Sequence, residues 1–295
     1  MATKTGTNAS NQIWGTNYAD TIWGDASPMS SRAGALGNDQ ISGLGGNDTI
    51  YGDIQTLNIN SPFGGNDWLT GGAGNDSIYG DAKDMYSYSY GGGEHISGDA
   101  GADYLVGDAY HMWGSAQGGR DDLYGNNPDD MFAAADGRDV LIGDAAFMHG
   151  ASKGGSDWFH GQGDNDTLYG DAVEMYDSSR GGDDYLSGGA GNDILVGDAL
   201  YMYGTSQGGN DTLSGGSGND LYVFGARSGH DTIWGFGRVV GDDDVMDIRA
   251  YSNDSFATYI DENASGDAVV HLSATATVTL VGIDASQLGA SDFLI

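Results

Sequence analysis

The sequence predicts an all-β protein: a right-handed parallel β-roll, or β-solenoid, of glycine-rich nonapeptides, closed by a β-rich capping segment at its C-terminal end. Three observations predict this fold. An acidic or amide residue recurs in steps of nine from Asn11 to Asp220, an apolar residue stands two places after each of them, and glycine makes up 53 of the 295 residues. Repeats of one loop and one short strand bury a core only by stacking on one another.

The recurring acidic or amide residue is the closing residue of each nonapeptide, and its apolar follower defines a strand. Because side chains alternate across a strand, the follower is expected to point into the core. The closing residues are Asn11, Asp20, Asp39, Asp48, Asp67, Asp76, Glu94, Asp103, Asp121, Asp130, Asp139, Asp157, Asp166, Asp184, Asp193, Asp211 and Asp220. The followers are Ile13, Ile22, Ile41, Ile50, Leu69, Ile78, Ile96, Leu105, Leu123, Phe132, Leu141, Phe159, Leu168, Leu186, Leu195, Leu213 and Tyr222.

The loop before each closing residue has the chemistry of a cation site. Glycine takes positive φ without steric cost, so carbonyl oxygens can turn toward one point, and asparagine before the acid tolerates a left-handed conformation best among other residues. Carboxylate and carbonyl oxygens suit Ca²⁺, and the chain has no cysteine for zinc or copper. The predicted ligands are the acidic closing residues, Asp231, and the glycines Gly43, Gly45, Gly71, Gly72, Gly74, Gly188, Gly189, Gly191, Gly215, Gly216 and Gly218.

The charge of the chain supports multiple cations. A net charge of −33 repels itself in a compact body, and abundant glycine raises the entropy cost of folding. Stacking the acidic units predicts roughly 8 to 14 Ca²⁺ ions, which would cancel about half or more of that charge. Without cations the chain is expected to be poorly folded.

Seven nonapeptides in the same register replace the closing acid by Met or Leu. They begin with Gly-Asp and end at Met29, Leu57, Met85, Met112, Met148, Met175 and Met202. The methionines are expected to pack inside the solenoid as gap fillers, with a surface row of Met and Tyr for a partner as the alternative. Acids that could reach a neighbouring ion are Asp25, Asp53, Asp81, Asp99, Asp108, Asp144, Asp171 and Asp198.

The length of one solenoid turn stays open at this stage. The Met-containing units recur every 27 or 28 residues, except for an interval of 36 that holds one extra nonapeptide around Asp130 and Asp139. A turn of about 18 residues would alternate these units on two sides, whereas a turn of about 27 would stack like on like.

The repeats are similar to the hemolysin-type calcium-binding nonapeptides of bacterial RTX proteins, over residues 11–295. The resemblance favours a two-sided roll and implies export by a type I secretion exporter, with an uncleaved signal near the Asp292-Phe-Leu-Ile295 end. It implies an extracellular protein, which agrees with a polar Met1–Gln12 segment and the absence of an apolar span. The expected organisation is an N-terminal tail at 1–10, the roll at 11–221 and the cap with the signal at 222–295.

Few residues point to catalysis. The chain has no His-Glu-x-x-His motif, and the Gly-x-Ser-x-Gly match at Ser152 lies in a glycine-rich repeat with no following helix. We therefore expect a secreted structural, adhesion or host-interaction protein that folds on Ca²⁺, with an extracellular surface or polysaccharide as partner. A carbohydrate- or lipid-active enzyme with its site near the Met and aromatic units is the alternative, and an ice-binding solenoid ranks last. An acidic surface repels phosphate, which argues against nucleic acid.

Overall fold

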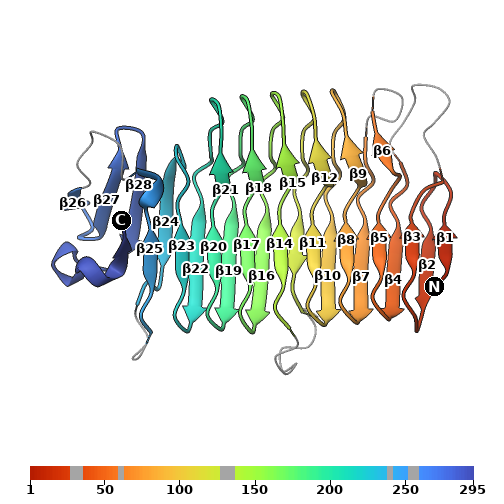
Figure 1. Ribbon diagram of the computed structural model, residues 1–295, viewed down its shortest axis with the longest axis horizontal. Coiled ribbons are helices and arrows are strands. Elements are labelled where there is room, and N and C mark those ends of the chain that lie inside the picture. The colour runs from red at the N-terminus through yellow and green to blue at the C-terminus, as the bar shows by residue number, and fades with distance from the viewer. Residues whose placement is uncertain (27–35, 59–62, 127–136, 238–241, 252–258) are drawn as a thin grey trace.

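The computed structural model of the protein describes residues 1–26, 36–58, 63–126, 137–237, 242–251 and 259–295. It confirms the all-β parallel solenoid: three sheets run along the long axis of the molecule, and successive turns advance from the N-terminal to the C-terminal end (Figure 1). The 11-stranded sheet is called sheet 1, the 12-stranded sheet is sheet 2 and the six-stranded sheet is sheet 3.

The strands of the three sheets are short and, apart from the C-terminal end, parallel. Sheet 1 contains β1 (Thr3–Thr5), β3 (Thr21–Trp23), β5 (Thr49–Tyr51), β8 (Ser77–Tyr79), β11 (Tyr104–Val106), β14 (Val140–Ile142), β17 (Thr167–Tyr169), β20 (Ile194–Val196), β23 (Leu221–Val223), β25 (Val245–Asp247) and β29 (Phe293–Leu294). Sheet 2 contains β2 (Gln12–Thr16), β4 (Gln40–Gly45), β7 (Trp68–Ala73), β10 (His95–Ala100), β13 (Asp122–Tyr124), β16 (Trp158–Gly163), β19 (Tyr185–Ala190), β22 (Thr212–Ser217), β24 (His230–Trp234), β28 (Ala276–Val281), β27 (Ala268–Ser273) and β26 (Tyr259–Glu262). Sheet 3 contains β6 (Thr56–Leu57), β9 (Ala82–Met85), β12 (Ala109–Met112), β15 (Ala145–Met148), β18 (Ala172–Met175) and β21 (Ala199–Met202).

One complete turn uses three nonapeptides and passes through sheet 2, sheet 1 and sheet 3 in that order. Equivalent residues of adjacent turns are 28 or 27 positions apart, and 36 apart where the extra nonapeptide falls. The longer of the two turn lengths is therefore the observed one, and the two-sided roll that the family resemblance favoured does not form. Each Met-containing unit makes a strand of its own and stacks on its like, so Met85 lies beside Met112 and Met112 beside Met148.

The followers and the methionines fill two separate cores. The followers, such as Ile50, Leu105 and Leu186, pack between sheets 1 and 2, and we call this part the roll. Sheet 3 and the parallel bridges that return from it enclose a second core of alanine, leucine and methionine, which we call the lobe. Leu57, Met85, Met112, Met148 and Met175 are fully buried there, which confirms the inward packing expected for these units. Met29 lies outside the described residues.

The C-terminal end has a different construction. Strands β26, β27 and β28 pair antiparallel, while β28 continues the parallel stack by pairing with β24. Strand β29 pairs with β25, and the 3-10 helices η1 (Arg249–Tyr251), η2 (Ala285–Gln287) and η3 (Ala290–Asp292) lie between these strands in the sequence. This arrangement covers the last parallel strands, which would otherwise expose unpaired backbone groups.

Candidate metal centre

The closing residues stack in two columns that run along the solenoid. The neck column precedes the strands of sheet 2, and the edge column precedes the strands of sheet 1. In both columns the backbone N–H of one closing residue donates to Oδ1 of its counterpart in the next turn: Asp48 N to Asp76 Oδ1 is 2.6 Å and Asp157 N to Asp184 Oδ1 is 2.8 Å. The neck column contains Asp39, Asp67, Glu94, Asp121, Asp157, Asp184, Asp211 and Asp231, and the edge column contains Asp20, Asp48, Asp76, Asp103, Asp139, Asp166, Asp193, Asp220 and Asp244.

The second carboxylate oxygen of most closing residues is buried and has no hydrogen-bond donor. An unsatisfied buried charge is costly, so a row of such oxygens calls for a cation. The residues whose Oδ2 no donor of the described chain reaches are Asp39, Asp48, Asp67, Asp76, Asp103, Asp121, Asp157, Asp166, Asp184, Asp193, Asp211, Asp220 and Asp231.

Glycines in the adjacent loops leave room for these Oδ2 atoms, because they have no β-carbon. A β-carbon placed on Gly43 or Gly188 would lie 2.3 Å from Oδ2 of Asp48 or Asp193, and one on Gly71 would lie 2.4 Å from Oδ2 of Asp76. The next predicted glycines, Gly72, Gly74, Gly189, Gly191, Gly216 and Gly218, all have positive φ, between 103° and 145°. These positions therefore need glycine for the backbone freedom that the sequence analysis invoked, whereas Gly45 is not among the glycines with positive φ.

A third column of acids comes from the Gly-Asp-Ala units. In each turn the aspartate accepts a hydrogen bond from the backbone N–H of a glycine that precedes a closing residue of the neck column; Gly65 N to Asp53 Oδ2 is 2.9 Å and Gly119 N to Asp108 Oδ1 is also 2.9 Å. The bond crosses the narrow part of the turn between roll and lobe, which we call the neck. This lobe column contains Asp25, Asp53, Asp81, Asp108, Asp144, Asp171 and Asp198, all at most 2 % exposed.

Burial disfavours the ionised form of nearly all these acids. It raises the pKa of Asp48 to about 6 and that of Asp103 to about 8 in the edge column. In the neck, burial and then the charges of neighbouring carboxylates raise the pKa of Glu94 well above its usual range. Asp20 at the first turn differs, because a hydrogen bond from the Thr16 side chain lowers its pKa. Ionisation of these acids in the folded chain is therefore unfavourable unless a positive charge lies close to them.

The chemistry of these columns fits a hard divalent cation. The donors are carboxylate oxygens with backbone carbonyls close by, and calcium accepts six to eight such ligands in a flexible geometry. The three acid columns contain no histidine or cysteine for a soft or nitrogen-preferring metal; His95, His149 and His160, for example, lie in aromatic stacks instead. The arrangement can hold cations between turns.

The structure places most predicted acids in the columns but not all. Asp130 and Phe132 lie outside the described residues. Asp99 is a partly exposed member of β10 with φ of 66°, and Ser97 Oγ donates to it at 2.7 Å, so it belongs to none of the columns. Asp244 is a further member of the edge column that the sequence pattern did not identify: the backbone N–H of Asp220, its counterpart in the preceding turn, donates to Asp244 Oδ1 at 3.0 Å. The apolar Met246 two places later was the available signal. Gly237 and Gly241 precede the acid, but Asp242 replaces the glycine that stands two places before the closing acid in most other units.

The expected role of the asparagines is wrong. None of Asn38, Asn47, Asn66, Asn75, Asn165, Asn192, Asn210 and Asn219 is among the residues with positive φ in the described chain. Their side chains instead link turns: Asn75 N donates to Asn47 Oδ1 at 3.1 Å, and Asn219 N donates to Asn192 Oδ1 at 2.7 Å. Asparagine thus extends the inter-turn ladder one residue outward from the closing acid.

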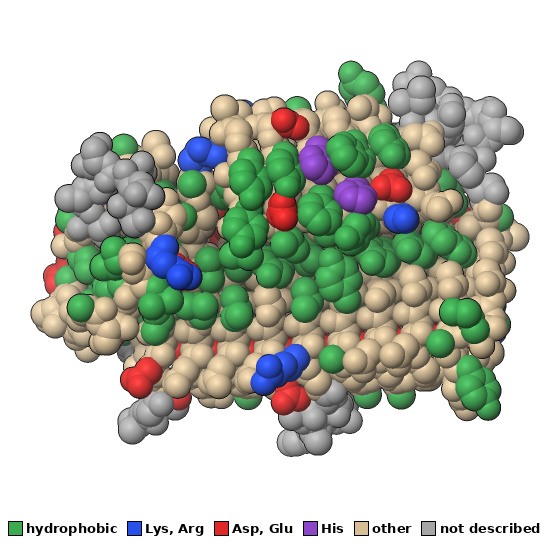
Figure 2. Space-filling model, in the orientation of Figure 1, with side chains coloured by type: hydrophobic (Ala, Val, Ile, Leu, Met, Phe, Trp, Pro, Cys, Tyr) green, Lys and Arg blue, Asp and Glu red, His purple; other side chains and the backbone are tan. Residues whose placement is uncertain are grey.

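Hydrophobic side chains gather on the outer face of sheets 1 and 3 (Figure 2), and many of them are aromatic. The residues directly after the methionines stack in register, with ring centroids 4.1 Å apart for Trp113 and His149, 4.7 Å for His149 and Tyr176, and 4.9 Å for Tyr176 and Tyr203. At the bend between the two sheets, outward-pointing apolar residues such as Ile142 are almost fully buried by neighbouring rings. The surface row thus consists of the aromatic residues, while the methionines lie inside.

Within the described residues, none of the helices has the length and apolar character needed to cross a membrane. The family described as RTX calcium-binding nonapeptide repeat (4 copies) matches the chain at residues 5–27, 33–55, 63–82, 88–109, 115–146, 153–172, 179–199 and 206–226. These segments cover more than half of the chain and contain most of the three acid columns. No curated protein matches it.

Proposed function

Because the chain belongs to the RTX calcium-binding nonapeptide repeat family and is a calcium-binding β-roll protein, we propose that it folds around Ca²⁺ ions held between adjacent turns. The observation that carries this proposal is the row of buried carboxylate oxygens without a donor. We propose the acidic closing residues and their glycine loops as the ligands, with roughly 8 to 14 ions in all.

Electrostatics supports a folding role for the ions. The net charge is −33, and the acids of the three columns are buried, whereas no Lys or Arg side chain is among the buried residues of the described chain. Each uncompensated buried charge destabilises the fold by several kcal/mol, of the order of the whole stability of a domain, about 5–15 kcal/mol. Calcium binding energy would then be folding energy, as in other metal-dependent folds.

A calcium titration tests this proposal. Metal-stripped protein at pH 7.5 should show little β-structure by far-ultraviolet circular dichroism and should gain it cooperatively as Ca²⁺ is added. Mg²⁺ at the same ionic strength serves as the control and should act weakly, because it needs stricter octahedral geometry. Full β-structure in metal-stripped protein would contradict the proposal.

We further propose that folding is delayed until the chain has left the cell. A chain that stays unfolded at low calcium can pass through a type I exporter, with residues 222–295 carrying the signal, and then fold in calcium-rich surroundings. Expression of the full chain with an active exporter should release folded protein into the medium, whereas an exporter unable to hydrolyse ATP should retain it. Equal release with both exporters would contradict this route.

The aromatic outer face supports a role in attachment to an extracellular surface or polysaccharide. Flat aromatic rings in register offer a platform for stacking with sugar rings, since an aromatic face can pack against the apolar C–H face of a sugar. Calcium-loaded protein should be retained on an insoluble polysaccharide, and Trp113→Ala with Tyr176→Ala should weaken retention without changing the circular dichroism spectrum. Release of shortened sugars during that assay would favour the enzyme alternative on the same face.

A further inference from the structure

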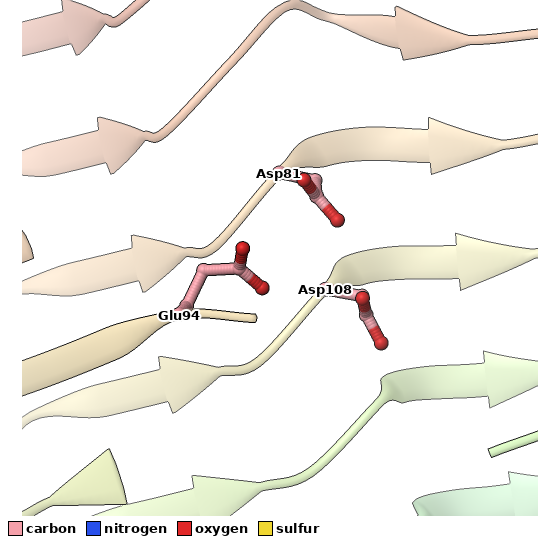
Figure 3. Close-up of side chains that lie close together, drawn as sticks. All are labelled: Asp81, Glu94 and Asp108. Atoms are coloured by element: carbon pink, nitrogen blue, oxygen red, sulfur yellow. The ribbon is translucent and has the colours of Figure 1, made fainter. Parts of the chain in front are cut away.

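The carboxyl groups of the neck column and the lobe column meet inside the neck. Asp81 and Asp108 belong to the lobe column of adjacent turns, and Glu94 is the closing residue between them. One oxygen of each lies within 4.8 Å of the others, and the three side chains point into the same interior space (Figure 3). All three residues are at most 2 % exposed.

The surroundings of Glu94 indicate that a positive charge is needed to compensate the carboxylates inside the neck. No donor of the described chain reaches either of its carboxylate oxygens, nor Oδ1 of Asp81. Glutamate carries its carboxylate one methylene further into the neck than the aspartates of the column do. It therefore points an unsatisfied, fully buried anion at two others, and such a group persists only with a compensating charge.

The surroundings leave few candidates for that charge. The roll core and the lobe core lie on either side of the neck, and both consist of apolar side chains. A β-carbon on Gly91 would lie 1.6 Å from Asp108 Oδ1 and 2.9 Å from Asp81 Oδ2, so glycine keeps this wall open for the carboxylates. No Lys or Arg side chain is among the buried residues of the described chain.

We propose that the neck binds its own row of divalent cations, one between each pair of adjacent turns, coordinated by two lobe-column aspartates and the neck-column acid between them. This inference rests on the proposed calcium-dependent fold but adds sites outside the glycine loops that close each nonapeptide. It gives the Gly-Asp-Ala units a ligand role in addition to closing the lobe.

The charges of the neck balance such a row. Each turn contributes one neck-column and one lobe-column carboxylate, so two negative charges meet one divalent cation per step along the solenoid. The edge column contributes one closing carboxylate per turn and cannot neutralise a divalent cation at every step. Adjacent cations would be about 4.8 Å apart, the spacing of neighbouring strands, and the carboxylates between them would screen their repulsion.

Equivalent acids stand at the neck in the other turns, while among the described residues only Asp81, Glu94 and Asp108 bring one oxygen each within 4.8 Å of the others. Neighbouring members influence one another electrostatically in each set, as expected for carboxylates that share one space. The sets are Asp25–Asp39–Asp53, Asp53–Asp67–Asp81, Asp81–Glu94–Asp108, Asp108–Asp121–Asp144, Asp144–Asp157–Asp171 and Asp171–Asp184–Asp198.

Counting bound calcium in matched variants tests the inference. The double variant Asp81→Asn and Asp108→Asn keeps the side-chain shapes but removes two neck charges, and it should bind about one to three fewer Ca²⁺ than the wild type by native mass spectrometry. Asp261→Asn with Glu262→Gln removes two charges from the exposed strand β26, outside the acid columns, and as the control for net charge it should keep the wild-type ion count. A neck variant that keeps the wild-type ion count would overturn the inference.

A second measurement does not depend on the folding of any variant. Crystals of the wild-type protein grown with Ca²⁺ should give anomalous scattering peaks between Asp81, Glu94 and Asp108. Peaks at the glycine loops alone would overturn the neck sites and leave the proposed calcium-dependent fold intact. A folded wild-type protein without bound calcium would overturn both.

Discussion

The edge column and the neck column carry the same closing residue but lie in different surroundings. At the edge, the chain passes directly from sheet 2 to sheet 1, and each turn brings one carboxylate to the column. In the neck, a Gly-Asp-Ala unit faces each closing acid across the interior, and burial together with added carboxylates raises the pKa of Asp157 and Asp184 well above their usual range. One nonapeptide motif thus makes two kinds of site, depending on what the solenoid places opposite it.

The largest expected effect is that of pH on the stability of the metal-free protein, because protons can replace calcium in neutralising the buried carboxylates. Burial raises the pKa of carboxyl groups in both columns, such as Asp48 at the edge and Asp121 in the neck, so the folded metal-free chain binds more protons than the unfolded chain. This stabilisation is fully present below the unfolded value of 3.8 and is lost as the pH rises through the folded values, about 6 for Asp48 and about 8 for Asp103. Thermal melts in metal-stripped buffer should show higher stability at pH 5 than at pH 8, and saturating calcium should remove most of that difference. Metal-free stability that rises between these pH values would contradict the burial argument.

A methyl group in the neck should be more damaging than one at the edge. A β-carbon on Gly107 would lie 1.8 Å from Gly143 O and 2.1 Å from Asp121 Oδ2, whereas one on Gly98 would lie 2.4 Å from Asp103 Oδ2. Gly107→Ala should lower the free energy of unfolding by more than about 4 kcal/mol, and Gly98→Ala by about 2–3 kcal/mol. Gly163→Ala is the control, because nothing lies within 4 Å of its added β-carbon, and it should change stability by less than about 0.5 kcal/mol. Equal losses at Gly107 and Gly163 in urea unfolding would contradict the close packing of the neck.

The neck is also expected to join roll and lobe into one cooperative unit. Met148 fills the lobe core and Leu141 the roll core, both fully buried, so truncation of either to alanine should cost about 2–5 kcal/mol. In saturating calcium, differential scanning calorimetry of both variants should show a single transition. A separate low-temperature transition in Met148→Ala would mean that the neck does not couple the two cores.

The smallest effect is expected on the aromatic outer face. Tyr176 stacks between His149 and Tyr203, and such ring contacts contribute about 0.5–1.5 kcal/mol. Tyr176→Ala should therefore lower stability slightly and leave the calcium count unchanged, while Tyr18→Ala, at a side chain 73 % exposed, serves as control. A lower calcium count in Tyr176→Ala would show that this face and the acid columns are not independent.

The nine-residue period predicts the closing residues and their buried followers, but it leaves open the number of nonapeptides in one turn. It identifies Asp39 and Asp48 as closing residues and Ile41 and Ile50 as buried followers, because these properties are local to one nonapeptide. It cannot distinguish two from three nonapeptides per turn, since either number gives a turn length that is a multiple of nine. The alignment of Met85 with Met112 across adjacent strands is a tertiary property, and it decides the number.

The neck depends on that same choice and could not be read from the sequence. Asp81 and Glu94 are 13 positions apart in one turn, and only a three-sided turn brings the Gly-Asp-Ala unit back to face the closing acid. Asp244 is hard to recognise for another reason, because Asp242 replaces the glycine that stands two places before the closing acid in most other units. The expectation for the asparagines failed because their conformation depends on hydrogen bonds between turns and not on the intrinsic tolerance of asparagine for a left-handed backbone.

Hydrogen–deuterium exchange at pH 7.5, with and without calcium, tests the central claim most directly. The backbone N–H groups of the closing residues, such as those of Asp48 in the edge column and Asp157 in the neck column, donate to carboxylates of the next turn. If cations hold these carboxylates in place, peptides from both columns should exchange rapidly in metal-stripped protein and become strongly protected when calcium is added. Equal protection in the two conditions would contradict the account, because the folded columns would then be stable without a cation.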